Sequence, residues 1–235
     1  MVAGASGSIG RQICEDLIKD GHGVIGTYFL NDRVIDKLPE VNWSKVNFAD
    51  LAETRQFYER YKDIDAFIYA AGIAPACLPG SGLRLNSVEL MTINLLSPIL
   101  GANIFIPIML ERQFGRIIFF GSVVAKQGGV GLSYYAASKS GIIGAVTSLN
   151  RDIRSLKHKN YTNSDLTINS ISPGYVLSDM TKEIPHKIKA EIERKSTLNR
   201  FLQTKDISRM VSFLLSESSD GISGANFEVN GGVNL

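Results

Sequence analysis

Cysteine, histidine and long apolar runs are all scarce in this chain of 235 residues. The two cysteines, Cys14 and Cys77, form no CxxC pair, which predicts reduced thiols in a cytoplasmic protein without the disulfide framework of a secreted one. The three histidines show no ligand spacing with each other or with either cysteine, which argues against a metal site. The longest apolar stretch, 97–110, suits a buried helix, because a membrane span needs about 20 residues. Glycines at positions 4, 7 and 10 interrupt the start, so no signal peptide is expected either.

An excess of one charge is also absent. Lys and Arg number 25 against 23 Asp and Glu, so neither nucleic acid as a main partner nor an acidic tail is predicted. Apolar residues make up 44% of the chain and charged residues 20%, and these ordinary values exclude a disordered, collagen-like or coiled-coil protein. The length fits one sizeable domain, so we expect a single domain over residues 1–235.

Short β-prone runs alternate with segments of helical period along the whole chain. The expected strands are 24–28, 66–70, 116–120, 166–172 and 226–229, and the expected helices are 9–19, 51–61, 88–110, 134–156 and 206–215. Asp50 and Thr204 stand where helix N-caps are expected, and Gly21 where the first helix ends. Such alternation predicts an α/β fold of the Rossmann type, with a doubly wound, mostly parallel sheet of about seven strands and helices on both faces.

A glycine-rich segment, 3–10, lies where a first strand would turn into the first helix. Glycines there let the backbone approach a pyrophosphate, which then lies on the helix N-terminus. The alternative is a glycine-rich turn that binds no ligand. The second strand is followed by Phe29, Leu30 and Asn31, without the acid that accepts from the ribose of NAD, and this favours NADPH. Arg11, Asn31 and Arg33 are the possible donors to its extra phosphate.

Tyr135 and Lys139 are four residues apart and therefore neighbours on one helix face. A second pair of this spacing, Tyr58 and Lys62, lies on a charged helix, and we interpret it as a solvated surface pair. The first pair differs because Ser122 stands 13 residues before Tyr135, directly after the strand 116–120. Ligand crevices of doubly wound sheets lie at such carboxyl ends of strands.

With these motifs in this order, the chain resembles the short-chain dehydrogenase/reductase family over nearly its whole length. The segments 4–10, 70–72 and 173–176, and the glycines near 224 and 231, resemble its cofactor loops and C-terminal signature. By this resemblance the catalytic residues are Asn94, Ser122, Tyr135 and Lys139. The implied cofactor-binding residues are Gly4, Ser6, Gly7, Ser8, Ile9, Gly10, Tyr28, Asn47, Phe48, Ala70, Ala71, Gly72, Tyr135, Lys139, Pro173, Gly174, Val176 and Ser178.

The chain departs from the family pattern at four places. The first strand is cut to residues 1–3, and Ser8 replaces the second glycine of the cofactor loop. Tyr69 and Ala70 replace an Asn-Asn pair, which removes polar groups that normally brace the central strands. The segment 157–165 is longer than the usual turn before the next strand.

The resemblance implies reduction of a carbonyl by hydride from the reduced nicotinamide. Tyr135 would act as the general acid. The neighbouring Lys139 ammonium, together with the cofactor's positive ring in the oxidised form, is expected to lower the pKa of its phenol. Ser122 would donate to or orient the same substrate oxygen. Asn94 would hold a water that links Lys139 to solvent.

Within the family, the segments 121–124 and 134–139 look most like those of β-ketoacyl-[acyl-carrier-protein] reductases. The prediction is NADPH-dependent reduction of 3-oxoacyl-[acyl-carrier-protein] to the 3-hydroxyacyl form, a step of fatty acid biosynthesis. One alternative is a dehydrogenase of the same family for a sugar, polyol or secondary-metabolite ketone. Another is a non-catalytic, cofactor-binding regulator, against which the intact set of four catalytic residues argues.

Partners follow from the same resemblance. An acidic carrier protein would need a basic docking surface, for which there are two candidates: Arg151, Arg154, Lys157, His158 and Lys159, or Arg112 and Arg116. A solvated helix end is the favoured interpretation of the first cluster. Residues 181–195 are expected to form a lid over the substrate. The helices 88–110 and 134–156 are expected to form the contacts of a homotetramer (or homodimer).

Overall fold

A seven-stranded sheet, entirely parallel, organises the computed structural model, which describes residues 1–81, 86–160 and 164–233, with the side chains of 158–160 excepted. The strands lie in the order β3-β2-β1-β4-β5-β6-β7. Their bounds are β1 Val2–Ala3, β2 Ile25–Tyr28, β3 Asn42–Lys45, β4 Ala66–Tyr69, β5 Phe114–Phe120, β6 Asp165–Pro173 and β7 Asn226–Val229. The predicted fold class is confirmed. The strand order reverses between β1 and β4, which is where a doubly wound sheet opens a crevice.

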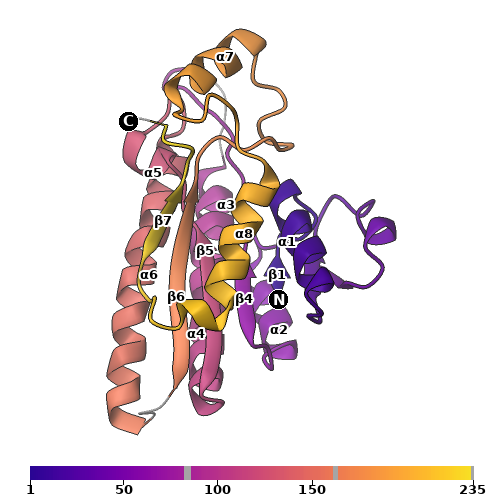
Figure 1. Cartoon of the computed structure of the whole chain (residues 1–235), viewed down its shortest axis with the longest axis vertical. Helices are drawn as coiled ribbons and strands as arrows, with labels where there is room; N and C mark the ends of the chain where they lie inside the picture. The colour runs from indigo at the N-terminus through magenta and orange to yellow at the C-terminus, as the bar shows by residue number, and fades with distance from the viewer. Residues whose placement is uncertain (82–85, 161–163, 234–235) are drawn as a thin grey trace.

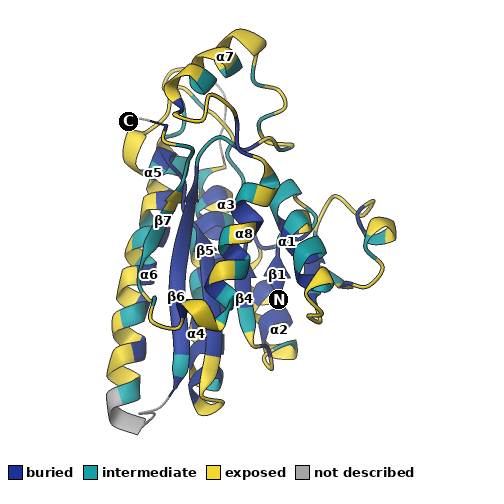
Figure 2. Ribbon diagram, viewed as in Figure 1, coloured by how far each residue is buried: buried dark blue, intermediate teal, exposed yellow. Residues whose placement is uncertain are grey.

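Helices cover both faces of this sheet, as Figure 1 shows. They are α1 Ser8–Lys19, α2 Leu51–Arg60, α3 Ser87–Met91, α4 Ser97–Glu111, α5 Val124–Gln127, α6 Ser133–Asn160, α7 His186–Lys195 and α8 Thr204–Leu215. One apolar core lies between the sheet and α2, α4 and α6, and the other lies between the sheet and α1 and α8. The central strands β5 and β6 are therefore almost wholly buried (Figure 2). Their near-continuous apolar sequences are typical of parallel strands covered on both sides.

Local hydrogen bonds and backbone conformation determine where the helices begin and end. Asp50 caps α2 as predicted, because its carboxylate accepts from the N–H groups of Ala52 and Glu53 at 2.8 and 3.1 Å. Gly21 has the left-handed conformation expected after α1, with φ of 83°. The prediction for Thr204 is wrong: the helix already includes it, and Gln203 is the N-cap, with its N–H donating to the Asp206 carboxylate at 2.9 Å.

Tyr58 lies in the core, so its interpretation as half of a surface pair with Lys62 is wrong. Its side chain is fully buried among aromatic rings, with centroids of Phe67 and Phe105 at 5.4 and 5.3 Å. Lys62 lies beyond Arg60, the last residue of α2. The buried face of this charged helix is narrow, and it is formed by Thr54, Phe57 and Tyr58 alone.

One strand and the end of one helix also differ from expectation. The strand β3 was not expected, because its sequence Asn-Trp-Ser-Lys is polar and lies at the edge of the sheet. The helix α6 continues to Asn160 and β6 begins at Asp165, so the connection is shorter than predicted, although residues 161–163 of the expected long turn lie outside the described part of the chain.

The expected helix 88–110 forms over residues Ser87–Glu111. It consists of α3, a π-helical turn at Thr92–Leu96, and α4, which follow each other without a break. This helix is long and apolar enough to cross a membrane by those two measures alone. Half of its most apolar stretch is buried inside the fold, as in the core helix of a doubly wound sheet. The buried half of this stretch packs into the core between the sheet and the helices that cover this face.

Candidate active site

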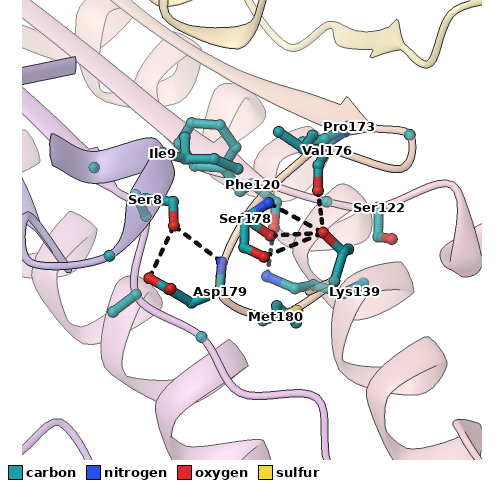
Figure 3. Close-up of a pocket in the computed structure, with 18 of the residues that line it drawn as sticks. Ser8, Ile9, Phe120, Ser122, Lys139, Pro173, Val176, Ser178, Asp179 and Met180 are labelled. Carbon is teal, nitrogen blue, oxygen red and sulfur yellow. Dashed lines mark hydrogen bonds between the residues drawn. The ribbon is translucent and has the colours of Figure 1, made fainter. Parts of the chain in front are cut away.

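The carboxyl ends of the central strands surround a cavity of about 310 Å³. Figure 3 shows its labelled side chains converging from the β1–α1 loop, the end of β5, the start of α6 and the segment after β6. The cavity is lined by Gly7, Ser8, Ile9, Gly10, Ala70, Ala71, Gly72, Phe120, Gly121, Ser122, Tyr135, Lys139, Pro173, Gly174, Val176, Ser178, Asp179, Met180 and Thr181. Its volume is at the lower end of the range for small-molecule sites.

The β1–α1 loop has the close packing that a pyrophosphate cradle needs. Gly4 has φ of 79°, and a Cβ atom there would lie 2.5 Å from the backbone nitrogen of Ala71. A Cβ atom at Gly10 would lie 2.2 Å from the carbonyl oxygen of Gly4. The helix α1 begins with Gly7 as its N-cap, which has no side chain to occupy the first N–H groups. The loop therefore fits the diphosphate of a dinucleotide cofactor.

The start of α6 brings Tyr135 and Lys139 into this cavity one helical turn apart. Lys139 is buried, and its Nζ donates to the carbonyl oxygen of Phe120 at 2.9 Å. The same Nζ lies 5.7 Å from the centroid of the Tyr135 ring. Ser122 follows β5, and its Oγ accepts from the N–H of Val124 at 3.2 Å. Three of the four predicted catalytic residues thus line one cavity.

Asn94 lies behind the cavity, in the π-helical turn. Its Oδ1 accepts from the N–H of Ile73 and its Nδ2 donates to the carbonyl of Ile73, both at 2.9 Å. The same Nδ2 donates to Ser138 Oγ at 3.2 Å. Both side-chain N–H groups are thereby used, so the side-chain amide has no donor left for the water expected above. These bonds join the loop after β4 to the helix that carries Tyr135, and the holding of a water by Asn94 stays a prediction.

Burial controls the protonation of the site. It lowers the pKa of Lys139 to about 8. Burial also raises the pKa of Tyr135 above its ordinary value, and hydrogen bonding with Ser122 opposes this in part. Lys139 is not among the causes of this shift, and its Nζ is directed to the Phe120 carbonyl. A lower pKa of Tyr135 beside both Lys139 and the positive ring of the oxidised cofactor stays a prediction. Tyr135 keeps its proton at neutral pH, as a general acid must.

Several predicted cofactor residues lie outside the cavity lining, namely Gly4, Ser6, Tyr28, Asn47 and Phe48. Gly4 is packed behind the loop, and Ser6 donates its N–H to the carbonyl of Thr27 at 3.2 Å. Asn47 Oδ1 accepts from the N–H of Ala49 at 3.1 Å. Phe48 is buried in the aromatic core, and its carbonyl accepts from Ser97 Oγ at 2.7 Å.

Four residues that were not predicted also line the cavity, namely Phe120, Gly121, Asp179 and Met180, together with Thr181 from the expected lid segment. The first two directly precede Ser122, and the other three directly follow Ser178. The sequence indicates their place in the site only through their position next to residues that were predicted.

Neither predicted basic docking surface lies at the cavity. Arg116 is only 1% exposed and is paired with Asp165 at 2.7 Å, and Arg112 pairs with Asp65 at the same distance. Both arginines precede or begin β5, at the opposite edge of the sheet.

Arg151 and Arg154 lie 16 and 19 residues after Tyr135, which is about 24 and 28 Å along α6. Lys157 is partly buried, and its Nζ donates to the Leu166 carbonyl at 3.3 Å. The side chains of His158 and Lys159 lie outside the described part.

The expected lid segment lies at the edge of the sheet where the strands have their carboxyl ends, which is the edge that holds the cavity. Thr181 lines the cavity, and α7 lies beyond the carboxyl ends of the strands, at the top of Figure 1. The side chains of α7 are mostly exposed.

Comparison with known proteins agrees with this geometry. A family model described as enoyl-(acyl carrier protein) reductase matches residues 4–234. The chain is 30% identical to the 3-oxoacyl-[acyl-carrier-protein] reductase FabG of Haemophilus influenzae, with 100% of this chain and 97% of that protein covered. The proteins of the same name from Rickettsia conorii and Staphylococcus aureus (strain Mu50) are each 29% identical, over 99% of this chain and 95% and 96% of theirs. The chain therefore belongs to the short-chain dehydrogenase/reductase family and is an NAD(P)-dependent oxidoreductase that acts on ketone or hydroxyl groups.

Proposed function

We propose that this protein is an NADPH-dependent 3-oxoacyl-[acyl-carrier-protein] reductase, which converts the 3-oxoacyl thioester to the 3-hydroxyacyl thioester. The observation that carries the proposal is the position of Ser122, Tyr135 and Lys139 in the same cavity as the uncapped N-terminus of α1. The names of the full-length relatives support the choice of a carrier-bound substrate.

NADPH is the proposed cofactor. The diphosphate would bind the first turn of α1, and the segments 70–72 and 173–178 would enclose the nicotinamide side. Residues 29–31, directly after β2, include no acid, and this supports NADPH over NADH, because a carboxylate there would repel the 2′-phosphate. Asn31, at this end of β2, already donates its Nδ2 to the carbonyl of Ser6 at 3.2 Å. Arg33 is exposed, and the exposed guanidinium of Arg11 forms one ion pair among the described residues, with Glu15 at 3.7 Å, so both are proposed as partners for that phosphate.

The bound cofactor supplies the hydride that the carbonyl carbon receives. Tyr135 donates its phenolic proton to the carbonyl oxygen as negative charge develops there. Ser122 directs its hydroxyl at the same oxygen and stabilises that charge. Lys139, with a pKa of about 8, exchanges protons readily near neutral pH and so supports the return of a proton to Tyr135. Asn94 positions the helix of Tyr135 through Ser138.

Tyr135→Phe tests the acid assignment. Mixed with NADPH and an acetoacetyl thioester, the variant should lose turnover by about 10²-fold or more, because the proton donor is gone. NADPH binding should stay within about twofold of the parent, since the phenol is small beside the whole cofactor site. Tyr134→Phe is the matched control, because this neighbouring tyrosine is 49% exposed and does not line the cavity. Unchanged turnover in Tyr135→Phe would reject the assignment.

The substrate class needs a separate comparison. We expect kcat/KM to be highest for an acyl-carrier-protein thioester, followed by a CoA thioester and then by free ketones. A preference for sugar, polyol or other free ketones greater than about tenfold would overturn the thioester proposal, since tenfold is about 1.4 kcal/mol of differential transition-state binding.

We further propose that the protein works in the cytoplasm as a homotetramer (or homodimer). Apolar side chains left exposed or half-exposed along the helix Ser87–Glu111 support this, among them Leu96, Ile99 and Ile104. For carrier docking we propose the exposed helix α7, which carries Lys187, Lys189, Arg194 and Lys195 against two glutamates.

A further inference from the structure

The cofactor loop and the segment after β6 are tied together by one pair of side chains. Ser8 is the first residue of α1, and its Oγ donates to Asp179 Oδ2 at 3.0 Å. The same Oγ accepts from the backbone N–H of Asp179 at 3.1 Å. Figure 3 shows both bonds, with Ser8 and Asp179 directly next to each other. The function proposed above does not use this contact.

The carboxylate of Asp179 lies where an anion is favoured. Ser8 belongs to the first turn of α1, and a helix N-terminus stabilises negative charge. Both residues line the cavity that would hold the cofactor. The carboxylate is therefore hydrogen-bonded to the Ser8 hydroxyl, next to the helix end that the diphosphate needs.

The segment that carries Asp179 is a well-defined turn. Thr181 Oγ1 donates to the carbonyl of Val176 at 2.6 Å and accepts from the N–H of Ser178 at 3.0 Å. The backbone of the turn thus holds the carboxylate near Ser8. The other carboxylate oxygen lies 3.9 Å from Lys182 Nζ, which provides an alternative partner on the same turn once the contact with Ser8 is broken.

We propose that Asp179 is an affinity-determining residue for the cofactor: its carboxylate competes with the cofactor's diphosphate for the N-terminus of α1, and Ser8 holds it there. This inference rests on the cofactor site proposed above. It gives a role to Ser8, since a glycine at this position would offer no hydroxyl to the carboxylate.

The size of the effect follows from Coulomb's law. Two negative charges about 6 Å from one carboxylate in water change an affinity by about tenfold. The carboxylate is 73% exposed, so salt should screen most of this repulsion.

Asp179→Asn removes the charge and keeps the shape. Binding of NADPH, and of ADP as a diphosphate without nicotinamide, is measured by titration calorimetry on the full chain. Both ligands should bind about 3- to 10-fold tighter than to the parent at low salt, and less than twofold tighter near 0.5 M NaCl. Glu59→Gln is the charge-matched control, because this exposed acid on α2 pairs only with Arg55, at 3.7 Å, among the described ion pairs. Its affinities should equal those of the parent.

A double-mutant cycle tests the part played by Ser8. In a Ser8→Ala background the carboxylate is no longer held at the helix end, so Asp179→Asn should improve NADPH affinity by less than about twofold. An equal gain in both backgrounds would exclude Ser8 as the holding group and overturn the proposal.

The outcomes separate this inference from the proposed function. If the parent binds NADPH and Asp179→Asn binds it equally or more weakly at low salt, the competition is overturned and the function stands. If the parent binds neither NADPH nor NADH, the proposed cofactor site fails and this inference fails with it.

Discussion

Tyr69 replaces a polar residue of the family pattern and nevertheless braces the site. Its side chain is buried, and its hydroxyl donates to the carbonyl of Ile93 at 2.7 Å, one residue before Asn94. The sequence analysis expected this substitution to remove bracing groups. The long phenol reaches the π-helical turn from β4, so a different side chain performs the same task.

Removing that hydroxyl should weaken the fold measurably. Tyr69→Phe leaves the carbonyl of Ile93 without this donor in a buried position, and we expect the free energy of unfolding to fall by about 1–2 kcal/mol. Urea denaturation measures this change, with the exposed Tyr134→Phe as control. Equal stability of the two variants would show that the hydrogen bond contributes nothing.

Lys139 makes stability depend on pH. Its folded pKa is about 8, below the ordinary 10.5, so between these values the unfolded chain binds more protons than the folded one. Lys139 should therefore contribute a rise in the free energy of unfolding from pH 8 toward pH 10, of up to about 3 kcal/mol. Above pH 9 the buried Cys14 thiol opposes this rise, because burial raises its pKa to about 12 and the folded state then keeps its proton. Above pH 10 the raised pKa of Tyr135 acts in the opposite direction, because the folded state then holds the extra proton.

The comparison protein for this measurement is Lys139→Met. It should lack the rise between pH 8 and 10, and chemical denaturation at a series of pH values measures both profiles. Parallel profiles for the two proteins would contradict the shifted pKa.

Among the elements, β5 and β6 share the most strongly buried charge. The Arg116 guanidinium is bound by both carboxylate oxygens of Asp165, at 2.9 and 2.7 Å, and by the Asp165 carbonyl at 2.8 Å. Its Nε is buried without a partner among the described residues. The pair joins neighbouring strands at the edge away from the cavity.

Breaking this pair should cost far more than breaking an exposed one of equal length. Asp165→Ala leaves a buried cation unpaired, and we expect a loss of about 2–4 kcal/mol, reduced somewhat because Asp165 is 42% exposed. Asp65→Ala breaks the other 2.7 Å pair, with Arg112, in which both side chains are exposed, and should cost about 1 kcal/mol or less. Thermal and urea unfolding compare the two variants, and similar losses would mean that burial does not set the cost.

The elements also show what could be predicted from sequence. Strands such as β5 and β6 and helices such as α1 and α8 carry strong apolar patterns, and their positions were expected within a few residues. The polar edge strand β3 has no such pattern, because neither of its faces is fully covered. The buried face of α2 is only one helical stripe wide, which hid Tyr58 among charges.

In the site, the order of motifs predicted which residues meet but not how they are oriented. Ser122, Tyr135 and Lys139 were expected in one crevice, and they lie in one. The direction of the Lys139 amine toward Phe120, and the contact of Ser8 with Asp179, depend on tertiary packing between distant segments. Spacing along the chain carries no information on such contacts.

At the scale of the whole molecule, a mass measurement tests the proposed homotetramer or homodimer. One chain has a mass of 25.7 kDa, and light scattering should give about four times this value, or twice for a dimer. The expectation is physical: exposed apolar side chains on a long helix gain stability when a partner covers them. A monomer mass across the micromolar range would exclude the assembly.

The helix α6 is 28 residues long and carries Tyr135 and Lys139 in its first two turns. Such a rod is about 42 Å long, so a pivot of about 1.5° at its far end shifts the phenol by about 1 Å. Displacements of that size can slow an enzyme about a hundredfold. Leu149 and Ile153 are buried in the core, on the part of α6 that is far from the reacting atoms. Their packing therefore fixes the direction of the helix, and a substitution that shifts the helix there should also displace the phenol of Tyr135.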